Sequence, residues 1–104
     1  MLIEDAITKL ADGGAAPLVA DLIAERLDVK PDLVLGALET MPDDPATALC
    51  RAAGLSVDAF SAVLRMRRRH QRGAIGPQEA LGAFRRLPME AARKLARTMA
   101  AEHD

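Results

Sequence analysis

Three prolines, Pro17, Pro31 and Pro45, are spaced 14 residues apart and constrain the fold more than any other feature of the sequence. A proline ring fixes φ near the helical value, and its missing N–H costs nothing in the first turn of a helix. Each proline begins a segment with helical character and is followed, ten positions later, by an apolar residue. The pattern predicts a repeat made of one helix and one turn.

Hydrophobic periodicity of the helical type continues along the rest of the chain. Half of the 104 residues are apolar, but tryptophan and tyrosine are absent. No stretch alternates between apolar and polar residues in the way that is typical of strands. We therefore expect an all-α fold: a single domain over residues 1–104, built as a compact stack of about six to seven short antiparallel helices in HEAT-like or solenoid-like hairpins. The predicted helices span residues 2–12, 17–28, 31–41, 45–53, 56–71, 77–86 and 88–102.

The helix predicted over residues 31–41 is apolar nearly all round. Its apolar residues are Leu33, Val34, Leu35, Ala37, Leu38 and Met41. A helix without a polar face is typical of a buried position. We therefore expect this helix to be the central one.

Charge is divided unevenly between the two halves of the chain, although the formal net charge is only -1. Residues 1–50 hold 10 acidic and 3 basic side chains, and residues 51–104 hold 5 acidic and 11 basic ones. Such an asymmetry indicates an acidic partner for the basic half, or two halves that attract one another within a protomer or across a homodimer.

The stretch RMRRRHQR, residues 65–72, concentrates the positive charge. The apolar stripe of its helix ends at Leu64, so we expect the last turns to project beyond the core as a solvated helix end. The alternative is a docking site for carboxylate or phosphate groups, which the planar guanidinium binds through two hydrogen bonds. The candidate partner-binding residues are Arg65, Arg67, Arg68, Arg69 and Arg72.

Residues 45–71 also fit a helix-turn-helix hairpin, with the small Cys50 between the helices and Gly54 at the turn. A nucleic-acid-binding protein is therefore the alternative function. The second helix would present Val57, Asp58 and Ala62 to a DNA groove, which are poor readers of base edges. No aromatic residue lies near the arginines to stack on bases, which disfavours single-stranded RNA as well.

No constellation of residues points to catalysis, so we expect a protein that is not an enzyme and has no cofactor or metal. The candidates are His70, His103, Cys50 and the hydroxyl groups of Ser56, Ser61 and Thr98. Cys50 falls on the inward side of its predicted helix, where a thiol acts as a small apolar group. A single cysteine forms no intramolecular disulfide, and no signal peptide or membrane-spanning run is present, so we expect a cytoplasmic location without membrane contact.

The segments DDPATALCRAAGLSVDAFSAVLRMRRRH and EALGAFRRLPMEAARKLAR resemble the C-terminal part of a family of HEAT-like helical proteins from alphaproteobacteria, a bacterial domain of unknown function. The resemblance covers residues 43–100. It implies a solenoid-like helical fold, offers no catalytic residues to carry over, and suggests a fragment of a longer chain. Together with the charge pattern, it leads us to expect an adaptor or regulatory module that binds an acidic protein partner through its arginine-rich half.

Overall fold

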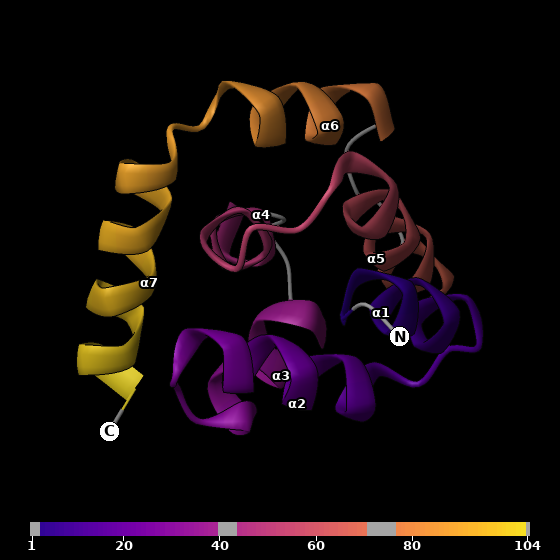
Figure 1. Ribbon diagram of the computed structural model, residues 1–104, viewed down its shortest axis with the longest axis horizontal. Coiled ribbons are helices and arrows are strands. Elements are labelled where there is room, and N and C mark those ends of the chain that lie inside the picture. The colour runs from indigo at the N-terminus through magenta and orange to yellow at the C-terminus, as the bar shows by residue number, and fades with distance from the viewer. Residues whose placement is uncertain (1–2, 40–43, 71–76, 104) are drawn as a thin grey trace.

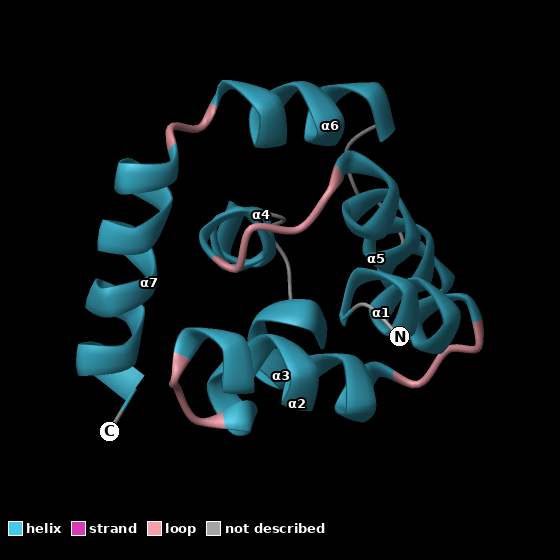
Figure 2. Cartoon of the chain, viewed as in Figure 1, coloured by secondary structure: helices cyan, strands magenta, loops and turns pink. Residues whose placement is uncertain are grey.

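The computed structural model in Figure 1 describes residues 3–39, 44–70 and 77–103. These residues form seven α-helices and no strand (Figure 2): α1 (Ile3–Asp12), α2 (Ala16–Leu27), α3 (Pro31–Glu39), α4 (Asp44–Ala52), α5 (Val57–His70), α6 (Pro77–Arg86) and α7 (Met89–His103). The predicted all-α stack is confirmed. Predicted helix ends at residues 2, 41 and 71 lie outside the described residues, and each of the others agrees with the structure to within one residue.

The prolines act as the sequence pattern predicts. Pro31 is the first residue of α3, and Pro17 and Pro45 are the second residues of α2 and α4. In the first turn of a helix the N–H groups have no partner within the helix, so the proline loses no hydrogen bond there.

The turns after α1 and α2 share one geometry. Each turn contains a residue with a left-handed backbone: Gly14, two positions after α1, with a φ of 78°, and Asp28, directly after α2, with a φ of 57°. The next N–H then donates to a carbonyl five residues back, at 2.9 Å from Ala15 to Leu10 and at 3.0 Å from Val29 to Ala24. This arrangement satisfies carbonyls that would otherwise be unpaired at the helix ends. Gly14 and Asp28 are 14 residues apart, which matches the spacing of the prolines.

Helix α4 lies at the centre of the molecule, and Figure 1 shows it end-on with the other helices arranged around it. Helix α7 packs against one side of α4, α6 crosses above it, and α2 and α3 lie below. Helix α1 packs on α5 and α2 and completes the ring. The Cα radius of gyration is 12.1 Å, close to the value of about 13 Å expected for a compact domain of this length.

The prediction that residues 31–41 form the central helix is therefore wrong. In α3, Leu33 and Leu35 are half-buried and Gly36 is exposed, whereas α4 buries six of its nine residues. These six are Ala46, Thr47, Ala48, Leu49, Cys50 and Ala52. Small side chains let neighbouring helices approach α4 on every side. Hydrophobicity alone, which ranks leucine above alanine, does not reveal this.

The two aromatic residues of the chain join α5 to α6. The Phe60 and Phe84 rings are stacked, with centroids 4.3 Å apart and planes 11° from parallel, and both residues are buried. The Arg51 guanidinium of α4 lies 5.4 Å from the Phe84 ring centre, and its Nε donates to the Leu87 carbonyl at 3.0 Å. These contacts hold the turn between α6 and α7 against the central helix.

Candidate functional site

The structure separates the arginines that the sequence groups together in residues 65–72. Arg65 is exposed and forms an ion pair with Asp12 of α1, with 3.0 Å between Nη2 and Oδ1. Arg68 is half-buried. The Arg69 side chain and residue Arg72 lie outside the part of the chain that is described. Arg65 and Asp12 thus bring the acidic and basic halves together at one point, as their opposite charges predict.

The prediction that α5 projects beyond the core after Leu64 is wrong, because Arg67 is buried. Its exposed fraction is 2%, and Met66 beside it is also buried, at 1%. The Arg67 Nη1 donates to the carbonyls of Ala37 and Leu38, at 2.7 and 2.8 Å. These carbonyls lie in the last turn of α3, where carbonyl groups lack partners within the helix and the helix dipole favours a cation. Arg67 therefore joins α5 to the end of α3 and is not available to a partner.

Cys50 is fully buried, as the sequence predicts. Burial raises the pKa of its thiol to about 12, although the positive charge of Arg67 opposes the shift. A protonated, inaccessible thiol is neither a nucleophile nor a metal ligand at neutral pH.

The hydroxyl groups considered for catalysis are bonded to nearby backbone groups. Ser56 Oγ accepts from the Ala59 N–H at 3.2 Å and caps the start of α5. Ser61 donates to the Val57 carbonyl, and Thr98 to the Lys94 carbonyl. The side chains of His70 and His103 lie outside the described set. Among the described residues, no group of three or more histidine, cysteine or acidic side chains is placed to hold a metal, and no helix is long and apolar enough to cross a membrane.

The hairpin predicted to bind DNA consists of α4, the buried central helix, and α5. On the face that would read a groove, Ala62 is fully buried and Asp58 is exposed. Arg65 at the end of that face is paired with Asp12. This face of α5 therefore offers neither a continuous exposed surface nor a positive one.

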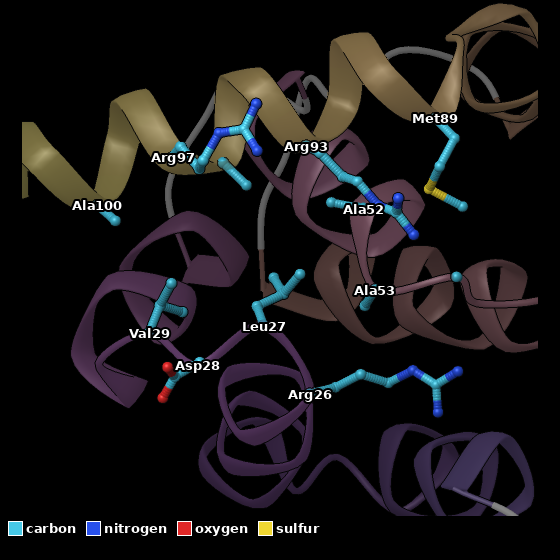
Figure 3. A pocket seen from close by; sticks show the side chains of 12 residues that line it. Arg26, Leu27, Asp28, Val29, Ala52, Ala53, Met89, Arg93, Arg97 and Ala100 are labelled. Carbon is cyan, nitrogen blue, oxygen red and sulfur yellow. The ribbon is translucent and has the colours of Figure 1, made fainter.

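A hollow on another part of the surface brings together arginines from distant parts of the sequence. It lies between α7, the turn after α2 and the end of α4, and has a volume of about 530 Å³ (Figure 3). We call it the arginine groove. It is lined by Arg26, Leu27, Asp28, Val29, Ala52, Ala53, Gly54, Met89, Arg93, Ala96, Arg97 and Ala100.

Three exposed arginines, Arg26, Arg93 and Arg97, give the arginine groove its charge. In Figure 3 the guanidinium groups of Arg26 and Arg93 lie on either side of Ala53, and the Arg97 side chain extends away from α2. Arg26 runs along the turn at Gly54, where a Cβ would lie 3.7 Å from its Nη2. Within the described residues, none of the three guanidiniums has an ion pair or a hydrogen bond.

The rest of the lining is apolar or small, apart from Asp28. Guanidinium groups over such a floor can bind carboxylates through paired, charge-assisted hydrogen bonds while apolar groups of the same ligand lose contact with water. This grouping could not be predicted from the sequence, because residues 26, 93 and 97 are brought to one hollow by the packing of α7 against α4.

A second hollow, of about 300 Å³, lies beside Arg67 and is lined also by Met66, Leu38 and Glu39. Its buried cation already binds the α3 carbonyls, so the hollow is part of the structural contact between α3 and α5.

No protein-family model, curated protein or solved structure matches the chain. The resemblance to HEAT-like proteins of alphaproteobacteria stays a prediction.

Proposed function

We propose that this chain is a non-enzymatic interaction module that docks an acidic segment of a protein partner in the arginine groove. The observation that supports it is the set of three exposed guanidiniums, at Arg26, Arg93 and Arg97, which lie beside an apolar floor and have no ion pair or hydrogen bond among the described residues. A partner that carries carboxylates next to an apolar side chain satisfies both parts of this surface.

One observation favours a protein ligand over nucleic acid. Phe60 and Phe84 are the only aromatic residues of the chain, and both are buried against each other, so neither can stack on a base. The helix-turn-helix alternative gains no support from the buried Ala62.

The proposal can be tested with a fluorescein-labelled helical peptide that carries one leucine and two glutamates one turn apart. Fluorescence anisotropy should show that this peptide binds the wild-type chain and that its binding weakens with salt. A peptide in which glutamines replace the two glutamates should not bind. The variant R93Q/R97Q should weaken binding by about tenfold or more, because charge-assisted hydrogen bonds contribute about 1.5–3 kcal/mol each.

The matched control is R85Q/K94Q, which removes the same charge from two exposed residues of α6 and α7 outside the arginine groove. It should change the affinity by less than about twofold, since exposed charges contribute little. Asp28→Asn should strengthen binding, because it removes a carboxylate from the lining. Equal losses of affinity for the peptide in R93Q/R97Q and in R85Q/K94Q would contradict the proposal. Duplex DNA that displaces the peptide and binds more tightly would favour the nucleic-acid alternative.

A further inference from the structure

The outward face of α2 carries the type of segment that the arginine groove suits. Leu18, Asp21 and Glu25 lie three and four positions apart, so they share one side of the helix. All three are exposed, and Leu18, at 51%, is one of two large apolar side chains exposed in the described part of the chain. The buried residues of α2, among them Ile23 and Ala24, occupy the opposite side.

The charges on this face match those of the arginine groove in spacing. Asp21 and Glu25 are one helical turn apart on α2, and Arg93 and Arg97 are one turn apart on α7. Residues at this spacing have Cβ atoms about 5–6 Å apart, so two carboxylates on one helix can face two guanidiniums on another. Arg97 is exposed, and exposed side chains change rotamer readily.

Neither set of charges is satisfied within one copy. Among the described residues, the Asp21 and Glu25 carboxylates have no ion pair or hydrogen bond, and the same holds for the guanidiniums of the arginine groove. The acidic face points outward from α2, whereas the groove lies beside the C-terminal end of that helix, against α7. The two surfaces can therefore meet through contact between different copies.

We propose that a second copy of this chain docks the α2 face of Leu18, Asp21 and Glu25 into the arginine groove. This inference rests on the proposed function, since it names the partner of the same groove. Leu18 then contacts the apolar floor formed by residues such as Leu27 and Ala52, and the two carboxylates meet Arg93 and Arg97. The two surfaces differ, so the contact is head-to-tail, and it leads to a closed ring or an open chain of copies.

The contact involves one helix face and one groove, so its area belongs with weak, transient interfaces. Self-association should therefore require high protein concentration. It should also weaken by about tenfold or more between low and high salt, because salt screens exposed charges.

Charge reversal in separate copies tests the proposal. Sedimentation equilibrium of the wild-type chain should show reversible association, and D21K/E25K and R93E/R97E should each be monomeric under the same conditions. Each reversed variant places like charges on both surfaces. An equimolar mixture of the two variants should associate again, because each supplies the surface that the other has lost. Circular dichroism checks that both variants fold. If a reversed variant does not fold, the neutral variants D21N/E25Q and R93Q/R97Q are used instead. A mixture of these two neutral variants regains one contact and should give a 1:1 dimer.

A wild-type chain that stays monomeric, or a mixture that does not associate, would overturn the proposal. So would association that persists in the charge variants and is lost in Leu95→Ala, which would place the contact on the other exposed apolar side chain, on α7. The labelled acidic peptide separates this inference from the proposed function. If it binds the arginine groove while the copies do not associate, self-docking is wrong and the docking function stands. If neither binds, both are wrong.

Discussion

Arg67 shows that a charged residue in an apolar stripe can continue the core. Its stem lies beside buried Met66, and its guanidinium reaches the carbonyls at the end of α3. A buried cation is stable only where acceptors replace the water it has lost. Here the helix end supplies them, so Arg67 belongs to the structure rather than to a docking surface.

We expect Arg67→Met to lower the free energy of unfolding by about 1.5–3 kcal/mol, because methionine keeps an unbranched apolar side chain in place of the arginine stem but leaves the Ala37 and Leu38 carbonyls without this donor. Urea denaturation measures the difference. The control Arg65→Met removes the exposed ion pair with Asp12 and should cost about 0–1 kcal/mol. Similar losses in both variants would show that the buried hydrogen bonds of Arg67 add nothing to stability.

Cys50 gives a prediction about pH, since burial raises the pKa of its thiol to about 12 from an ordinary value of 9.0. The folded chain therefore holds this proton more tightly than the unfolded chain does. The contribution to stability is complete below pH 9 and decreases as the pH rises toward 12, by up to about 1.4 kcal/mol per pH unit. The difference in unfolding free energy between wild type and Cys50→Ala should shrink over this range. A pH-independent difference would place the thiol in contact with water.

At the level of elements, α4 determines how closely the other helices can approach. Half of its six buried residues are alanines, and the helices around it belong to both halves of the chain. An interior packed this closely has no space for additional methylene groups.

Ala46→Leu should therefore destabilise the fold by about 1–3 kcal/mol, because the larger side chain must displace the helices that surround α4. Ala46 is 1% exposed. The matched control is Ala101→Leu on the exposed side of α7, which should change stability by less than about 0.5 kcal/mol. Thermal unfolding followed by circular dichroism compares the two. An unchanged melting temperature for Ala46→Leu would mean that α4 has free volume beside it.

The helices themselves could be predicted from the sequence because local signals define them. Prolines begin α2, α3 and α4, and a left-handed residue follows α1 and α2. The central position of α4 could not be predicted in this way, because it depends on how well small side chains pack and not on their hydrophobicity. The role of Arg67 was missed for a similar reason, since its acceptors lie about 30 residues away in the sequence.

For the molecule as a whole, the charge asymmetry between the halves was visible in the sequence, but its geometry was not. Arg65 and Asp12 join the halves within one copy, whereas Arg26 contributes a cation from the acidic half to the arginine groove. The candidate site therefore could not be found as a cluster in the sequence. Its three arginines come to line one hollow through the packing of α7 against α4, near the turn after α2.

The central position of α4 also has a consequence for synthesis of the chain. A ribosome releases residues 44–52 before residues 89–103, yet α7 covers one side of α4. A nascent chain that lacks α7 leaves the alanine-rich surface of α4 in contact with water and with other proteins. Incomplete chains of this kind are prone to aggregate and are substrates for chaperones. The fold of these seven helices can therefore be completed only after α7 has left the ribosome, so one side of α4 stays uncovered while the residues between α4 and α7 are being synthesised.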